Sequence, residues 1–346
     1  MPRHLRYQSS EWSTHMITAR CTQGYKLLRP SKKLNSLVAG CLARALELHR
    51  DDIELNHHAF MSNHYHLLLT CKNAQAKARF MCHLNSNLGR ELCRLHKRRD
   101  HAWEGRYASH ELVDEEALIS AYKYLFKNSV KERLVAHPRD WPGLHGWAQL
   151  CGGRAVEGEW LDRTRWYFAR QTKRGRDLRE RDFVRALPLR LSRPREWAAW
   201  SEEEYRARCD EWTEEAMREV AEELAAQGLA PRRARGAGRA ARVASAKVVS
   251  GAARAVEALA AVLGAEAVCA QEVFEELEVR RRTPRPLCRA GCVRAFGGYL
   301  DAYRAFKEAF LDASRRVREA VARGERTPRV SFPDGGVPFY VGRAWT

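Results

Sequence analysis

The chain has 346 residues, 45% of them hydrophobic, which is enough for a packed core in one large domain or two ordinary ones. Its formal net charge of +18 and pI near 9.7 indicate an anionic partner, most commonly nucleic acid. No apolar run is long enough to span a membrane, and the ten cysteines contain no CxxC pair. We therefore expect a cytoplasmic, nucleoid-associated protein with reduced cysteines and no membrane partner.

The first 150 residues alternate between strand-like and helix-like segments. Strand patterns cover 15–21, 53–62, 64–71 and 104–113, and helix patterns cover 31–50, 74–99 and 114–134. This β-α-β-β-α-β order predicts an α+β fold of the ferredoxin-like, split-βαβ type, an antiparallel sheet with helices on one face. The other face would stay free for a ligand. The Pro-, Gly- and Trp-rich stretch 137–147 is typical of a domain end.

The remaining residues have a different composition. They are rich in Ala, Arg and Glu and show helical periodicity over 201–228 and 252–280. We interpret 1–150 as one domain and 151–346 as a basic, mainly α-helical accessory region whose role the sequence leaves open. The basic stretch PRRARGAGRAAR, 231–242, is either a disordered linker or a phosphate-contacting arm.

Two histidines stand one residue apart in the apolar segment HAFMSNHYHLLLTC, 58–71. Because side chains alternate along a strand, His64 and His66 share one face, whereas Tyr65 and Leu67 face the helices. The two Cα atoms would lie about 7 Å apart, which suits two imidazole nitrogens converging on one divalent cation. The alternative is a pair of hydrogen-bonded histidines on a sheet surface.

The helix expected over 114–134 carries a second pair of polar side chains. Tyr124 and Asn128 are four residues apart and therefore neighbours on one flank of the apolar stripe. A tyrosine one turn from an amide oxygen can present a nucleophile and a third metal ligand together. The alternative is an amphipathic helix with a half-buried tyrosine.

Four segments, in this order, resemble the REP-associated branch of the single-tyrosine HUH transposases. They are HMITARCTQGYKLLRP, MSNHYHLLL, HAWEGRYASHELVDEE and YLFKNSVKERLV, within residues 15–150. The resemblance implies that His64 and His66 bind Mg²⁺ or Mn²⁺, with Asn128 as the third protein ligand and Tyr124 as the nucleophile. Ser129 departs from the proline that this family usually has after the asparagine.

The resemblance also implies an activity, namely metal-dependent cleavage and strand transfer of single-stranded DNA through a 5′-phosphotyrosine intermediate. The partner would be single-stranded or hairpin DNA, bound by a monomer or a homodimer. Candidate phosphate contacts are Lys97, Arg98 and Arg99, with Lys127 and Lys131 near the tyrosine. Two alternatives remain open: a non-catalytic hairpin-DNA or RNA-binding protein derived from a transposase, and a metal-dependent RNA nuclease.

Overall fold

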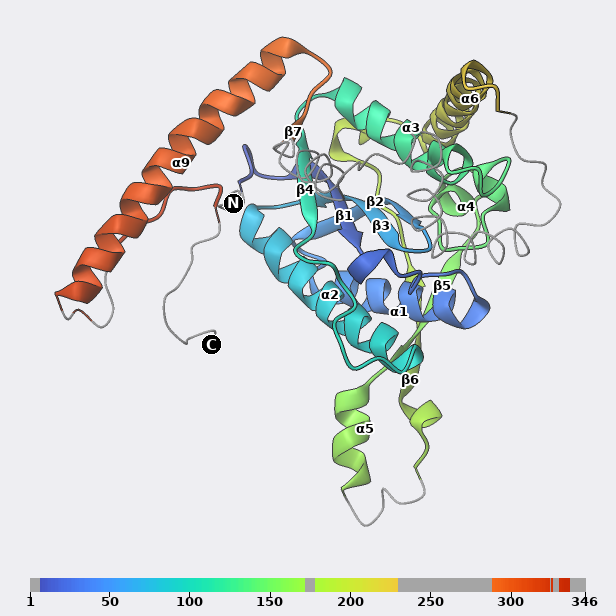
Figure 1. Cartoon of the computed structure of the whole chain (residues 1–346), viewed down its shortest axis with the longest axis horizontal. Coiled ribbons are helices and arrows are strands. Elements are labelled where there is room, and N and C mark those ends of the chain that lie inside the picture. The colour runs from blue at the N-terminus through green and yellow to red at the C-terminus, as the bar shows by residue number, and fades with distance from the viewer. Residues whose placement is uncertain (1–6, 172–177, 230–287, 324, 326–329, 337–346) are drawn as a thin grey trace, which may run out of the picture.

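The computed structural model describes residues 7–171, 178–229, 288–323, 325 and 330–336. These residues form a mixed α/β structure with a mainly antiparallel sheet (Figure 1). The basic stretch 231–242 and the helical periodicity of 252–280 lie outside the described residues. Among the described residues, no helix combines the length and the apolar character needed to cross a bilayer.

The elements follow the expected order through the first 131 residues. In chain order they are β1 (Ser13–Arg20), α1 (Lys32–Leu48), β2 (Ile53–Phe60), β3 (His64–Cys71), α2 (Ala74–Leu95), β4 (Ala108–Leu112), α3 (Glu115–Lys131), α4 (Trp147–Leu150), β5 (Val156–Leu161), α5 (Arg163–Arg170), β6 (Val184–Leu189), α6 (Glu202–Ala226), β7 (Cys288–Arg289) and α9 (Val293–Ala322). The capping residues explain where two of the helices begin. The Ser31 hydroxyl accepts the Leu34 N–H at 3.2 Å, and the Asp114 carboxylate accepts the Ala117 N–H at 2.8 Å.

One sheet of five strands organises the molecule, in the order β2-β3-β1-β4-β7. The first four strands pair antiparallel, in the order that a β-α-β-β-α-β chain predicts. The register of β1 with β3 places Thr18 opposite His66 and Arg20 opposite His64. The fifth strand, β7, comes from far along the chain and pairs parallel with β4, so that Arg289 lies beside Leu112. The sequence did not indicate this edge strand.

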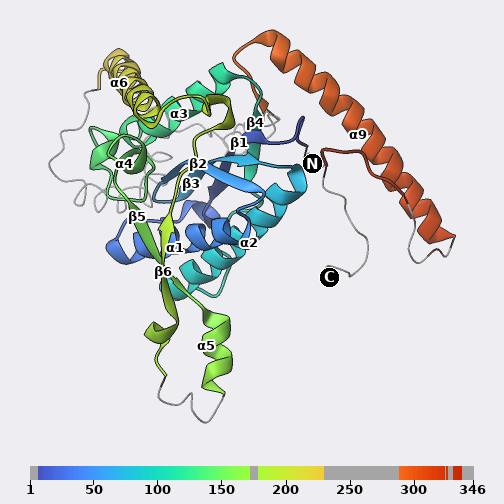
Figure 2. The same cartoon turned by 180° about the vertical axis from the view of Figure 1, so that it is seen from behind.

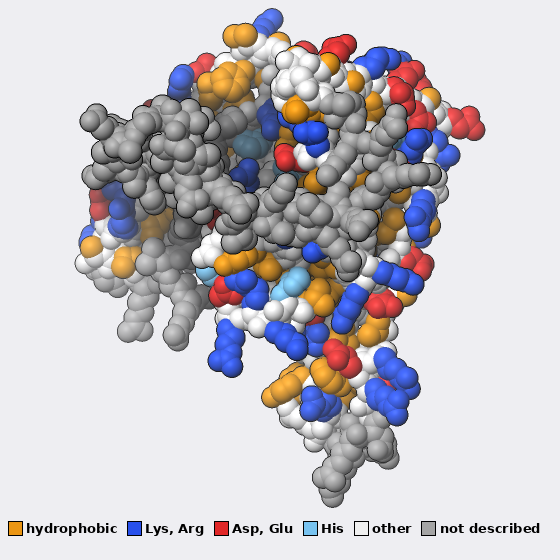
Figure 3. Space-filling view, turned by 45° about the vertical axis from the view of Figure 1, so that its right-hand side comes forward, with side chains coloured by type: hydrophobic (Ala, Val, Ile, Leu, Met, Phe, Trp, Pro, Cys, Tyr) orange, Lys and Arg blue, Asp and Glu red, His pale blue; other side chains and the backbone are white. Residues whose placement is uncertain are grey.

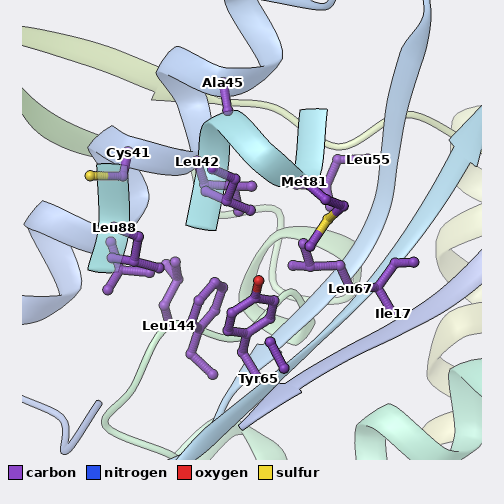
Figure 4. Close-up of a cluster of buried hydrophobic side chains, with 14 of the residues drawn as sticks. Ile17, Cys41, Leu42, Ala45, Leu55, Tyr65, Leu67, Met81, Leu88 and Leu144 are labelled. Carbon is purple, nitrogen blue, oxygen red and sulfur yellow. The ribbon is translucent and has the colours of Figure 1, made fainter. Parts of the chain in front are cut away.

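The largest hydrophobic core lies between the sheet and helices α1 and α2. Figure 4 shows Leu42, Met81 and Leu88 from the helices meeting Leu55 and Tyr65 from the strands. Tyr65, which the alternation placed on the helix side, is fully buried. Its neighbours on the same face of the strands complete the core, among them Ile17, Leu67 and Leu69.

The expectation that helices cover one face only is wrong. Helix α3 packs on the opposite face of the sheet from α1 and α2, and α6 packs on α3 (Figures 1 and 2). This second core joins Leu118, Ala121 and Leu125 of α3 to Met16 and Leu68 of the sheet. The reason is that the centre of β3 is apolar on both sides, and a strand buried on both faces needs two covering layers.

The described residues after 150 contain strands as well as helices, because β5 and β6 form an antiparallel hairpin. The hairpin packs on α1 where two glycines meet. A Cβ added at Gly40 would lie 2.1 Å from the carbonyl oxygen of Glu159, and one at Gly158 would lie 2.0 Å from the nitrogen of Gly40. Two buried residues of β6, Leu187 and Leu189, join the α1–α2 core. The boundary placed at residue 150 stays a prediction.

Candidate metal and nucleophile site

Three of the side chains singled out in the sequence meet on the α3 side of the sheet. The ring centroids of His64 and His66 are 4.9 Å apart, and the ring of Tyr124 lies edge-on to His66 at 5.3 Å. Tyr122, two residues earlier on α3, points elsewhere: it is fully buried and its hydroxyl is 2.8 Å from that of Tyr205. Of the two tyrosines, Tyr124 is therefore the one beside the histidine pair.

Hydrogen bonds to one nitrogen of each imidazole leave the other nitrogen available. Nδ1 of His66 is 2.8 Å from the hydroxyl of Thr18, and Nδ1 of His64 is 2.8 Å from the amide oxygen of Asn63. Nε2 of His66 is buried and has no hydrogen-bond partner among the described residues. Partners of this kind orient the ring of a metal-binding histidine and set its tautomer, so the arrangement fits a cation held by the Nε2 atoms.

The surroundings keep both imidazoles neutral at pH 7. Burial, with a smaller effect of the Arg20 charge, lowers the pKa of His64 to about 4. Burial also holds the pKa of His66 well below its usual value, and the charges of Arg289 and Arg20 act in the same direction. Neutral imidazole is the form that binds a metal.

Asn128 lies one turn of α3 beyond Tyr124. It is 5% exposed, and its amide nitrogen is buried without a hydrogen-bond partner in the described part of the chain. Further along α3, Val130 packs in one cluster with Met61 from the turn between β2 and β3. The helix therefore runs toward the end of β3 that carries His64, which puts Asn128 on the His64 side of Tyr124.

The residues present fit a cation bound through two imidazoles and an amide. No group of three His, Cys, Asp or Glu side chains placed to hold a metal occurs among the described residues. A third protein ligand would therefore be of another type, and the side-chain amide oxygen of Asn128 is a donor of that type. All three donors are neutral and would leave the charge of a divalent cation unbalanced. The balancing negative charge would have to come from the substrate.

Two arginines near this site were not singled out in the sequence. The guanidinium carbon of Arg289, in β7, is 5.5 Å from the centre of the Tyr124 ring. Arg20 stands opposite His64 at the end of β1 and is exposed. Neither has a carboxylate partner among the described residues. No local pattern could reveal Arg289, because only the pairing of β7 with β4 brings it here.

The lysines expected near the tyrosine are held by α6. Lys127 is 2.7 Å from Glu219, and Lys131 is 3.0 Å from Glu223. Burial by itself would lower the pKa of Lys127, but the hydrogen bond and charge of Glu219, with Glu223, outweigh burial and raise it. Both lysines therefore stabilise the α3–α6 contact, and their role as DNA contacts stays a prediction.

The basic cluster after α2 divides in the same way. Arg98 stacks over the Tyr25 ring at 4.4 Å and forms an ion pair with Asp100. Lys97 and Arg99 are exposed, and Lys97 has a positive φ of 54° because the chain turns after α2 ends at Leu95. The structure leaves Lys97 and Arg99 accessible to a phosphate backbone.

No protein-family model and no curated protein matches this sequence. Among solved structures, a REP-associated tyrosine transposase bound to a REP hairpin is similar, at 17% identity and a TM-score of 0.35. The alignment covers 44% of this chain and 87% of that chain. A TM-score of 0.35 does not establish a common fold, so the functional proposal depends on the site itself.

Proposed function

We propose that this protein cleaves and rejoins single-stranded DNA through a covalent bond between Tyr124 and a 5′ phosphate. The observation that carries the proposal is the contact of the Tyr124 ring with His66, beside His64, on a face of a ferredoxin-like sheet. The motif resemblance to single-tyrosine HUH transposases and the charge of +18 support the same activity.

Tyr124 acts as the nucleophile. Its hydroxyl oxygen attacks the phosphorus, the bond from phosphorus to the 3′ oxygen breaks, and the phenolic proton passes to solvent. The leaving oxygen takes up a proton and becomes a free 3′ hydroxyl. The reaction exchanges one phosphodiester for another, so a 3′ hydroxyl can reverse it without ATP.

Arg289 and Arg20 stabilise the substrate phosphate. Each carries a permanent positive charge without a carboxylate partner among the described residues, and they come from two strands, β7 and β1. Both charges help to lower the pKa of His66, after burial and the neighbouring His64, which supports a shared role of the two arginines beside this histidine. Negative charge that develops on the phosphate oxygens during attack is then placed between fixed cations.

His64, His66 and Asn128 would hold Mg²⁺ or Mn²⁺, which polarises a phosphate and neutralises its charge. Because these ligands are neutral and two arginines lie nearby, the site by itself attracts a cation weakly. A bound phosphate supplies the missing negative charge. We therefore expect metal and DNA to bind cooperatively, each raising the affinity of the other.

Trapping the covalent intermediate tests this function. The protein is incubated with single-stranded DNA from regions flanking its gene and with Mn²⁺, and adducts are separated under denaturing conditions. Tyr124→Phe should abolish the adduct and leave DNA binding within about twofold, since only one hydroxyl is lost. Tyr122→Phe is the matched control: it loses a core hydrogen bond to Tyr205 and should still form the adduct.

The same experiment, repeated with an RNA strand of the same sequence, separates the alternative functions. A non-catalytic binding protein would bind the DNA without forming an adduct or a cut strand. A metal-dependent RNA nuclease would cut RNA without a protein-linked product. An adduct that persists in Tyr124→Phe and disappears in Tyr122→Phe would show that the nucleophile is misassigned.

A further inference from the structure

The β5–β6 hairpin extends away from the sheet and carries α5 near its end; we call residues 156–171 and 178–189 the arm. It is the lower projection in Figures 1 and 2. No residue of α5 is buried, and two adjacent aromatic side chains, Tyr167 and Phe168, are 61% and 62% exposed. Their rings contact each other edge to face at 5.4 Å. Two large aromatic side chains side by side in water indicate a surface that binds a partner.

The base of the arm is firmly attached to α1 and α2. The Arg163 guanidinium binds both carboxylate oxygens of Glu91 in α2, one of them at 2.7 Å. The Arg44 guanidinium of α1 stacks over the Trp160 ring at 4.8 Å. Bidentate and stacked arginines of this kind fix geometry, so α5 is held in a defined position over α2.

A groove of about 800 Å³ lies between the arm and helices α1 and α2. Trp160 and Tyr167 form aromatic parts of its wall. Three carboxylates line the groove, and the cationic side chains outnumber them. The five cationic side chains are Lys33, Arg90, Arg94, Arg163 and Arg181. Within the described ranges, Lys33 and Arg90 are exposed and pair with no carboxylate. Figure 3 shows basic and hydrophobic side chains next to one another on the arm.

We propose that the arm and this groove are a second binding surface for single-stranded DNA, on the side of the sheet opposite to Tyr124. Bases stack on Tyr167 and Phe168, and phosphates contact Lys33 and Arg90. Aromatic side chains beside cations that have no carboxylate partner are the usual surface for unpaired nucleotides, whereas a duplex keeps its bases out of reach. The choice of DNA rests on the proposed function, but the surface itself needs no catalysis.

Fluorescence anisotropy with a labelled oligothymidine strand, in EDTA so that no cleavage occurs, tests the surface. The double variant Tyr167→Ala/Phe168→Ala should bind the strand about tenfold or more weakly, because stacking of one base is worth roughly 5- to 150-fold. Leu311→Ala on α9, which removes another exposed apolar side chain, is the matched control and should bind like the parent protein.

A second pair of substitutions tests the groove. Lys33→Gln with Arg90→Gln should make the salt dependence shallower by about 1.4 in the slope of log affinity against log salt, roughly 0.7 for each lost phosphate contact. Binding to a blunt duplex should change less than binding to the single strand in the aromatic variant.

Three results would overturn the proposal. The first is that Tyr167→Ala/Phe168→Ala binds the single strand as tightly as Leu311→Ala does. The second is that the aromatic variant loses affinity for the duplex and for the single strand by the same factor. The third is that the parent protein is a dimer and the aromatic variant a monomer. Because all measurements are made without cleavage, failure here is distinct from failure of Tyr124→Phe to abolish the adduct.

Discussion

Lowering the pH from about 7.5 to about 5.5 should destabilise the protein through two histidines buried at the β2 edge of the sheet. His58 in β2 is fully buried, and His145, which bridges to Ala59 of the same strand, is buried. Burial, with a smaller effect of the His145 charge, lowers the pKa of His58 to about 3. Burial lowers the pKa of His145 to about 4, although the hydrogen bond with the Leu125 carbonyl opposes it.

The sign and size follow from proton linkage. In the unfolded chain both histidines titrate near pH 6.5, so below that pH the unfolded state binds protons that the folded state excludes. The two neutral histidines therefore contribute fully to the unfolding free energy above pH 6.5, and this contribution is lost as the pH falls toward their pKa values in the folded protein. One pH unit below 6.5 each histidine costs about 1.4 kcal/mol, about 3 kcal/mol for the pair. That is a large part of a typical folding free energy of roughly 5–15 kcal/mol.

Urea unfolding followed by circular dichroism at the two pH values measures this loss. His58→Leu should reduce the pH dependence of the unfolding free energy by about one proton, because it removes one titrating group. Leucine breaks no side-chain hydrogen bond at this position, since neither ring nitrogen of His58 has a hydrogen-bond partner among the described residues. Phe60→Leu, a change to a ring neighbour at 6.2 Å, is the control and should alter stability equally at both pH values. An unfolding free energy that is the same at both pH values would refute the reasoning.

The other predictions concern the site and the attachment of the arm. Arg289→Gln should slow adduct formation about 10- to 100-fold in single-turnover assays, which is the effect of losing one charged hydrogen bond. DNA affinity should stay within about threefold, and an unchanged rate of adduct formation would exclude Arg289 from the site. His64→Ala and His66→Ala should each remove nearly all cleavage, and the double variant little more; small additive losses would argue against a shared cation. Gly40→Ala should lower unfolding free energy by about 1–3 kcal/mol because its Cβ would meet the hairpin backbone, and a higher melting temperature would contradict this packing.

Much of the first 131 residues follows from local patterns. Helical spacing predicts α1 and α3, and the structure shows that Ser31 and Asp114 cap their N-termini. Strand alternation places Tyr65 on the α1–α2 side of the sheet and His66 on the other. The helical position of Tyr124 predicts that its side chain lies on one flank of the apolar stripe of α3 and not within the stripe. These features depend on backbone geometry within a few residues, which the sequence encodes directly.

One misjudged feature was still readable in the sequence. Leu67, Leu68 and Leu69 are consecutive and all fully buried, a run typical of a strand covered on both faces. The sequence also contains a weak strand pattern for β5, VEGEW, in which apolar or small residues (Val156, Gly158, Trp160) alternate with glutamates. Short strands of this kind lie within residues whose composition otherwise favours helices.

By itself the sequence determined the order of the first strands and helices, the shared face of His64 and His66, and the net charge of +18. The tertiary structure decided which face α3 covers, that Lys127 is bound by α6, and that Arg289 reaches Tyr124. The physical reason is that periodicity specifies which side of an element is buried but not what buries it. Contacts such as the β4–β7 pairing join segments far apart in the chain and form only when the whole core assembles.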